Sequence, residues 1–284
     1  MSEIPAVTRL PRNFHKTFKP ERQYISAMLS FAAAGGSGNY LEISRVTGIP
    51  TGKSSGKVPA ILDYCRGMGL LRLSEKTRSA VKKPELTDFG RIVLLEDPFL
   101  KTEVSQWMAH LQLCRPLFGA DVWYHTFFAG SQGLGATFSK EGLESYLKAV
   151  YGVSKGNGLI GPLFGTYDDE AALKTCGALI KNSDGSFSRR PAPIVDEFTF
   201  AYGAWLLQLL QDHFPDRRQV SEMELNTAAG WRTIPAWDSL AWKEVLRQVE
   251  QRGLLDVDRN MEPWLLSPQH DLGEAWRSIY NDMI

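Results

Sequence analysis

Residues 39–50 read Asn-Tyr-Leu-Glu-Ile-Ser-Arg-Val-Thr-Gly-Ile-Pro. Asn39 belongs to the residue types that cap the first turn of a helix, and Gly48 to those that end a helix in a left-handed conformation. A short helix is therefore expected between them, followed by a turn and a further helix that ends near Arg66. The further helix has a buried stripe at the i, i+3, i+4, i+7 spacing, formed by Val58, Ile61, Leu62 and Cys65. Two short helices joined in this way predict a helix-turn-helix.

The flanking segments extend this pattern. An apolar run over residues 24–33 predicts a preceding helix, which the Gly-Gly-Ser-Gly sequence at 35–38 closes. Behind the helix-turn-helix, residues 67–90 contain a strand, a cationic tip and a returning strand. A hairpin in this position is the wing of a winged helix. We expect residues 1–91 to form this first domain.

The charge of the chain is divided between its two ends. The net charge is zero, but residues 1–91 hold 15 Lys and Arg against 7 Asp and Glu, a balance of +8. The remaining residues hold 17 against 25, a balance of −8. Such an asymmetry indicates a nucleic-acid-binding face in the basic part.

Residues 92–215 are expected to form a helical domain. Its helices are predicted over 104–117, 122–128, 140–150, 168–181 and 195–213, with a loop or hairpin at 182–190. Residues 216–284 repeat the order of the first domain, with Ser221 capping a helix, a second helix ending at Gly253, and two short strands behind it. The fold class is therefore mainly α, with an N-terminal winged helix-turn-helix, a helical middle domain and a C-terminal winged-helix-like domain.

The last domain is predicted to bind protein. From Arg218 onward it holds 7 basic and 11 acidic residues, a balance of −4, which opposes contact with a phosphate backbone. Self-association is the simplest case.

The first domain has the residue types of a DNA interface. A helix can enter the major groove and contact base edges, while cations beside it contact phosphates. Lys57 and Tyr64 are the candidates for facing bases, and the cations of the wing are expected to contact phosphates. The candidate DNA-binding residues are Lys53, Ser54, Lys57, Tyr64, Arg66, Arg72, Lys76, Arg78, Lys82 and Lys83. A winged helix that binds only protein is the alternative, because the fold alone does not assign a function.

Three motifs that would indicate an enzyme or a metal site fail on spacing or context. The Gly-Lys-Ser at 52–54 resembles the end of a phosphate-binding loop, but Gly48 leaves three intervening residues where four are required. Residues 156–161 match the dinucleotide pattern, but a helix precedes them where a strand is required, so a loop between helices is expected. The paired spacing of a zinc site is missing from His110, Cys114 and His125. We therefore expect no catalytic residue, metal or cofactor.

The composition is that of a soluble protein. The chain has 284 residues, of which 43% are hydrophobic, enough to bury a core. It contains no stretch of the roughly 18 apolar residues that cross a bilayer and no secretory signal at its start. The three cysteines are far apart and odd in number, so we expect reduced thiols and a cytoplasmic location.

Several runs resemble an uncharacterised bacterial family, a domain of unknown function with an N-terminal winged helix. They are residues 13–18 (Asn-Phe-His-Lys-Thr-Phe), 52–54, 64–70 (Tyr-Cys-Arg-Gly-Met-Gly-Leu), 86–90 (Leu-Thr-Asp-Phe-Gly) and 97–100 (Asp-Pro-Phe-Leu). The resemblance covers roughly the first 130 residues well and the rest loosely, and Lys16 stands where the family usually has an acid. Members are found in anti-phage defence and DNA phosphorothioation-type islands, often near reductases of the phosphoadenosine-phosphosulfate type. The resemblance implies no catalytic residues.

The leading hypothesis is a non-catalytic DNA-binding accessory or regulatory subunit of a bacterial defence or DNA-modification system. Its partners would be double-stranded DNA and a protein of that system, with a second copy of the chain as one form of partner. The alternative is a protein-binding adaptor or structural subunit of a larger nucleoprotein effector complex. A third hypothesis is an enzyme with an unrecognised nuclease or nucleotide site.

Overall fold

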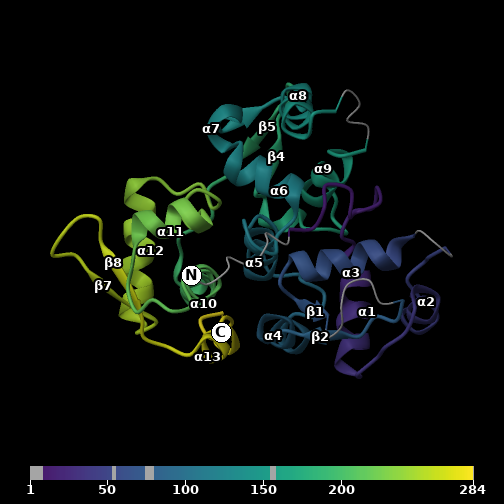
Figure 1. Cartoon of the computed structure of the whole chain (residues 1–284), viewed down its shortest axis with the longest axis horizontal. Coiled ribbons are helices and arrows are strands. Elements are labelled where there is room, and N and C mark those ends of the chain that lie inside the picture. Colours follow the sequence, from purple (N-terminus) through teal and green to yellow (C-terminus); the bar gives the residue numbers. More distant parts are fainter. Residues whose placement is uncertain (1–8, 53–55, 74–79, 154–157, 284) are drawn as a thin grey trace.

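The computed structural model describes residues 9–52, 56–73, 80–153 and 158–283. Within these ranges the chain is mainly helical, as the sequence predicts, and its short strands form small antiparallel sheets. Figure 1 shows three lobes, in the order of the chain, arranged around helix α5 (Glu103–Leu113). Every residue of α5 after Glu103 is buried, which is expected of a helix enclosed on all sides. The three lobes therefore share one central helix.

In the described residues the first lobe contains four helices and a two-stranded hairpin. Asn39 accepts hydrogen bonds from the backbone N–H groups of Leu41 and Glu42 at 2.9 and 3.1 Å, and Gly48 ends its helix at a φ of 71°, both as predicted. The elements are α1 (Arg22–Ala33), α2 (Tyr40–Thr47), α3 (Lys57–Gly67), β1 (Leu71–Leu73), β2 (Pro84–Leu86) and α4 (Asp88–Glu96). Helix α4 spans residue 91, where the sequence analysis places the end of the first domain, and ends at Glu96.

The middle lobe combines helices with a small sheet in the order β3-β5-β4. A helix was predicted over 168–181, and this is wrong. Gly177 adopts a left-handed φ of 59° and ends a short 3-10 turn, after which the chain pairs with β5 as a strand. The hairpin expected at 182–190 is present. The elements after α5 are α6 (Asp121–Tyr124), the π-helix η1 (His125–Ala129), α7 (Ser131–Leu134), β3 (Thr137–Phe138), α8 (Lys140–Tyr151), α9 (Gly161–Asp168), η2 (Lys174–Cys176), β4 (Leu179–Lys181) and β5 (Phe187–Arg189).

The third lobe repeats helices followed by a hairpin. Ser221 forms a reciprocal capping box with Glu224, as its sequence position indicates. The sheet order is β6-β8-β7. The elements are η3 (Asp196–Phe198), α10 (Thr199–His213), β6 (Val220–Ser221), α11 (Glu222–Ala229), α12 (Ser239–Gln251), β7 (Leu255–Asp258), β8 (Leu265–Pro268) and α13 (Leu272–Arg277).

The last helix packs on the first lobe. Helix α13 contacts both α4 and α10, and the ring of Trp276 lies 4.7 Å from that of Phe89. The buried apolar side chains form a single cluster that extends through all three lobes. None of the helices in the described ranges combines the length and apolar character that crossing a bilayer demands.

Candidate nucleic-acid interface

Helix α3, the predicted recognition helix, is largely buried, and only Lys57, Asp63 and Arg66 are partly exposed. The predicted core stripe is confirmed, since each of its four residues is at most 2% exposed. The opposite face is closed as well, because Ala60 and Tyr64 are 0% exposed. The Tyr64 hydroxyl donates to the backbone oxygen of Phe18 at 3.0 Å, and burial raises the pKa of Tyr64 well above its ordinary value. The prediction that Tyr64 faces bases is therefore wrong.

An N-terminal arm, residues 9–20, covers this helix. The ring of Phe14 lies 4.8 Å from that of Tyr64, and His15 is also buried beside it. Desolvation lowers the pKa of His15 to about 4, so this side chain is neutral in the folded protein near pH 7. The arm belongs to the hydrophobic core.

Lys57 is engaged by the residue that follows the arm. Its Nζ lies 2.6 Å from a carboxylate oxygen of Glu21 and 4.8 Å from the ring centroid of Tyr24. A base contact would require this partly buried ion pair to open. Lys57 therefore serves the packing of α3 in this structure and does not point a free ammonium group outward.

Part of the positive charge of residues 1–91 is paired with carboxylates in the rest of the chain. Arg9 pairs with Asp121 at 2.9 Å, and Lys19 pairs with Asp169. Both cations lie in the basic first part of the chain, and both carboxylates lie in the acidic remainder. Some of the positive charge thus fixes the arm to the middle lobe and is not available to an external anion.

The remaining predicted residues lie in different environments. Arg66 pairs with Asp63 at 2.7 Å, and Arg72, with a side chain 68% exposed, pairs with Glu85 at 3.2 Å across the hairpin. Lys82 is buried, and its backbone forms an antiparallel bridge with Gly38, so its side chain presents little surface to a phosphate. Lys83 is exposed. Four candidates lie outside the described residues: Lys53, Ser54, Lys76 and Arg78.

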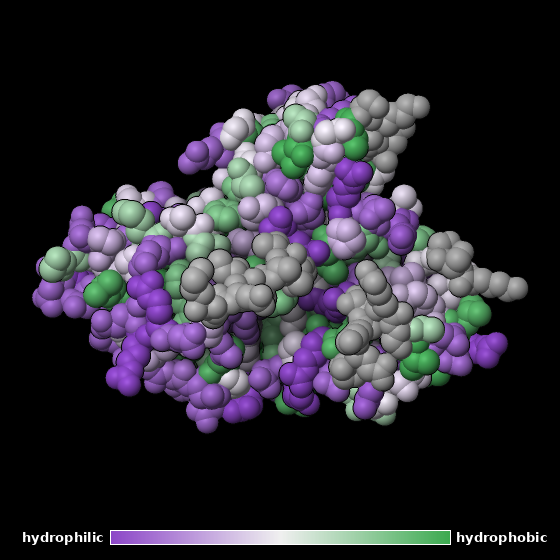
Figure 2. Space-filling model, viewed as in Figure 1, coloured by the Kyte–Doolittle hydropathy of each residue, from purple (hydrophilic) through white to green (hydrophobic). Residues whose placement is uncertain are grey.

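A groove of about 870 Å³ lies where the first lobe meets α5, α10 and α13, and we call it the junction groove. Four arginines line it: Arg66 from α3, Arg72 from β1, Arg91 from α4 and Arg115 directly after α5. Asp88 and Asp212 are the carboxylates among its lining residues. Figure 2, in the same view as Figure 1, shows that hydrophilic residues dominate this face of the molecule. The groove therefore combines an excess of guanidinium groups with apolar side chains such as Phe118 and Trp276.

The arginines of the groove differ in how easily their side chains can turn toward a ligand. Arg115 is buried, and its guanidinium lies 2.9 Å from Asp212, which also accepts from Gln208 at 2.8 Å. Arg91 is 62% exposed in its side chain, and its contact with Asp88 is a long 3.9 Å. Arg72 and Arg91 can thus turn toward a ligand, whereas Arg115 is fixed in the wall.

Amide groups add hydrogen-bonding capacity to the same wall. Gln112, Gln208 and Gln211 line the groove. Gln112 is 2% exposed, and its Oε1 is buried without a hydrogen-bond partner among the described residues. An unsatisfied buried acceptor of this kind is unusual in folded proteins.

Sequence reasoning missed three residues of the groove. Arg91 follows directly on the Leu-Thr-Asp-Phe-Gly run and could have been included with it. Gln112 and Arg115 carry no local signal, because only the packing of α5 against the other lobes brings them to the groove.

Of the three residues considered as metal ligands, His110 and Cys114 are buried in the core. The Nδ1 of His110 lies 2.6 Å from the hydroxyl of Tyr167 and 3.6 Å from the sulfur of Cys114, and burial lowers the pKa of His110 to about 3. His125 lies in η1, with Asp121 at 3.9 Å. The described residues include no group of three or more His, Cys, Asp or Glu side chains that could hold a metal ion together. Of the loop predicted at residues 156–161, residues 156 and 157 lie outside the described residues, and Gly161 is the first residue of α9.

Comparison with known proteins finds the fold but no family. No protein-family model matches the chain, and no curated protein matches it. A crystal structure of magnesium ion-bound SspB superposes with a TM-score of 0.67 at 15% sequence identity, covering 100% of this chain and 90% of that one. A second SspB crystal structure gives a TM-score of 0.66 at 14% identity, covering 99% and 90%. At this identity the chain is similar to SspB in fold, over nearly the whole length of both proteins.

Proposed function

We propose that this chain is a non-catalytic DNA-binding accessory or regulatory subunit of a bacterial defence or DNA-modification system. In this proposal α1–α3 with the β1–β2 hairpin form a winged helix, and α10–α12 with β6–β8 form a second one. DNA is bound by the hairpin and the junction groove, to which α3 contributes Arg66 for a phosphate and no residue for a base. The observation that carries the proposal is the convergence of Arg66, Arg72 and Arg91 on one groove.

The exposed arginines can exchange their carboxylate partners for phosphates. Surface ion pairs contribute about 0–1 kcal/mol, so opening those of Arg72 and Arg91 costs little. A guanidinium that donates two parallel hydrogen bonds to a phosphate forms a stronger, charge-assisted contact. The release of condensed counterions from the duplex supplies free energy for exchanging Glu85 or Asp88 for a phosphate.

Because the arm covers α3, contacts between this helix and DNA bases are limited. Phosphate contacts fix the position of a protein on the duplex, and base contacts supply sequence specificity. Since the face of α3 that would contact bases is buried by the arm, we expect binding with weak sequence preference. Charge reversal at Lys57 is unsuitable as a test of DNA binding, because it would place two carboxylates together at Glu21.

The proposed setting rests on the sequence resemblance to a family of defence and phosphorothioation islands. The likeness to SspB supports the fold across the full chain. One SspB structure contains magnesium, but the described residues of this chain do not form a matching cluster of ligands, so we assign no residue to a metal.

The test is the affinity of the full chain for a random-sequence duplex, measured by fluorescence anisotropy as salt is raised. Three phosphate contacts predict a slope of about −2.7 in log affinity against log salt. Arg72→Gln and Arg91→Gln should each reduce that slope by about one. Arg247→Gln is the matched control, because Arg247 is an exposed arginine in an i,i+3 pair with Glu244 outside the groove. No binding at low salt, or equal slopes for all variants, would overturn the proposal.

A protein-binding adaptor is the second candidate. It is favoured by exposed apolar side chains in the third lobe, where Leu240 and Met261 are each 79% exposed and Met223 is 54% exposed. Light scattering of the full chain over a range of concentrations tests self-association. Under this candidate Leu240→Glu lowers the mass of an associated species and leaves the salt slope for DNA unchanged.

A further inference from the structure

A separate pocket in the middle lobe lies between α9 and the β4–β5 hairpin, and its volume is about 290 Å³. This is near the lower end of the roughly 300–1,000 Å³ typical of small-molecule sites. The size suits one small molecule and not a length of duplex. No residue that lines the junction groove lines this pocket, so the two sites are independent.

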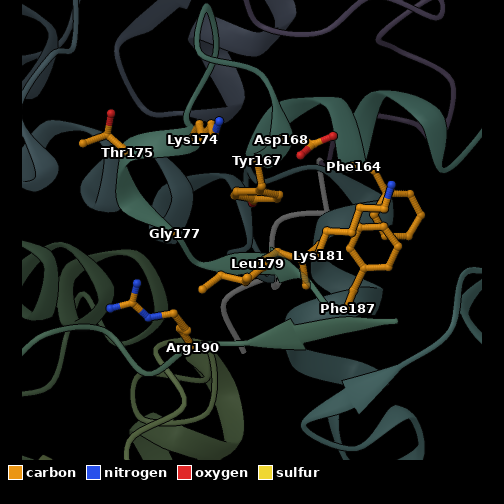
Figure 3. A pocket seen from close by; sticks show the side chains of 11 residues that line it. Phe164, Tyr167, Asp168, Lys174, Thr175, Gly177, Leu179, Lys181, Phe187 and Arg190 are labelled. Carbon is orange, nitrogen blue, oxygen red and sulfur yellow. The ribbon is translucent and has the colours of Figure 1, made fainter. Parts of the chain in front are cut away.

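The pocket has an aromatic side. The rings of Phe164 and Phe187 stack with centroids 4.0 Å apart, although they come from α9 and β5. Figure 3 shows Lys181 extending toward this pair of rings, Arg190 on the opposite side, and the ring of Tyr167 between them. An aromatic wall of this kind favours a ligand with a flat ring.

The polar side of the pocket selects for an anion. Lys174, Lys181 and Arg190 line it, against Asp168 as the one carboxylate in the lining. Lys174 pairs with Glu170 at 2.7 Å. Among the described residues, neither Lys181 nor Arg190 has an ion pair with a carboxylate. Both cations are thus available to a negatively charged ligand, one at each end of the pocket.

The glycine at position 177 leaves room for the guanidinium group of Arg190. Gly177 has a φ of 59°, and a Cβ at this position would lie 3.0 Å from Nη1 of Arg190. Glycine is favoured here both by the left-handed conformation and by the closeness of Arg190. Gly152 has an equivalent φ of 60° with nothing within 4 Å of its Cβ position, so it provides a matched comparison.

We propose that this pocket binds a nucleoside monophosphate unit, either as a free nucleotide or as the 5′-phosphorylated end of a strand. The base lies along Phe164 and Phe187 beside Lys181, and the phosphate is held at the opposite end of the pocket by Arg190. The inference does not depend on DNA binding in the junction groove.

The first experiment is calorimetric titration of the full chain with adenosine monophosphate and with inorganic phosphate. Adenosine monophosphate should bind with a Kd below about 1 mM, and phosphate at least tenfold more weakly. Lys181→Gln and Arg190→Gln should each weaken nucleotide binding roughly tenfold. Lys140→Gln, an exposed lysine on α8, should leave it unchanged. Absence of binding, equal affinity for phosphate and nucleotide, or unchanged affinity in both variants would overturn the proposal.

Comparing Gly177→Ala with Gly152→Ala distinguishes an effect on the pocket from a general loss of stability. Gly177→Ala and Gly152→Ala impose the same backbone strain, but only Gly177→Ala displaces Arg190. We expect nucleotide binding to weaken in Gly177→Ala alone. Equal loss in both variants would count against the site.

The source of the nucleotide is tested in the Arg72→Gln/Arg91→Gln background, which disables the junction groove. If a 5′-phosphorylated oligonucleotide competes with adenosine monophosphate and its 5′-hydroxyl counterpart does not, the ligand is a strand end. If neither competes while the mononucleotide binds, it is a free nucleotide. Nucleotide binding in this background, together with duplex binding unchanged from the parent chain, would uphold the pocket and reject the groove.

Discussion

The guanidinium of Arg115 lies 2.9 Å from the carboxylate of Asp212 and connects the end of α5 to α10 in the wall of the junction groove. Both side chains are largely buried. Removing one partner of such a pair leaves an uncompensated charge, so Asp212→Asn should lower the free energy of unfolding by about 3 kcal/mol. Urea denaturation checks this, with Glu244→Gln at an exposed pair as the control, expected within about 1 kcal/mol of the parent. Equal effects would show that the Asp212 pair is no more important than a surface one.

Lys57 distinguishes the two ways in which the first lobe could hold DNA. Because its ammonium group pairs with Glu21, Lys57→Gln should cost about 1 kcal/mol of stability and change DNA affinity by less than twofold. Arg72→Gln should show the reverse pattern, with a clear loss of DNA affinity and little change in stability. Anisotropy and urea denaturation on both variants check this. A large loss of DNA binding in Lys57→Gln would restore α3 as the recognition helix.

Acid should destabilise the protein through its buried histidines. Burial lowers the pKa of His15 to about 4 and that of His110 to about 3, against an unfolded value near 6.5. Between these values the unfolded chain binds more protons, so stability is full above about pH 6.5 and falls as the pH decreases. Each histidine contributes up to about 1.4 kcal/mol per pH unit in this window.

The measurement is the unfolding free energy from urea denaturation between pH 5 and 6.5. His110→Gln removes one titrating group. The slope of the unfolding free energy against pH should therefore decrease by the contribution of His110. Thr126→Val, a buried substitution that removes no titratable group, is the control and should keep the parent slope. An unchanged slope in His110→Gln would mean that His110 is not held neutral by the fold.

The close approach of the Leu70 backbone explains why the Leu-Thr-Asp-Phe-Gly run ends in glycine at position 90. A Cβ at this position would lie 1.9 Å from the backbone oxygen of Leu70, a contact that neither group can relieve by a side-chain rotation. Gly90→Ala should therefore destabilise the protein by about 3 kcal/mol and separate α4 from β1. Gly133→Ala is the control, because nothing lies within 4 Å of its Cβ position. Thermal unfolding of both variants checks the difference, and similar midpoints would contradict it.

Local rules made part of the fold predictable. The caps at Asn39, Gly48 and Ser221 depend on hydrogen bonds within a few residues, and all three are present where the sequence indicates them. The helix predicted over 168–181 failed, because the left-handed Gly177 and pairing with β5 outweigh the apolar spacing in that segment.

The site was less predictable than the fold. Exposed Arg72 could be recognised from its position in the hairpin, but the burial of Tyr64 depends on an arm more than 40 residues earlier in the chain. Periodicity describes one face of a helix and carries no information on what covers the other. Arg115 and Gln112 reach the groove only through packing between lobes.

The packing of Trp276 on Phe89 sets the order in which the groove is completed during synthesis. Helix α13 supplies one wall, so a growing chain that has folded its first lobe still lacks that wall until residues 272–277 have emerged from the ribosome. Under the proposed function, the nascent chain would thus remain unable to hold DNA in the groove until α13 has been translated and has packed on α4.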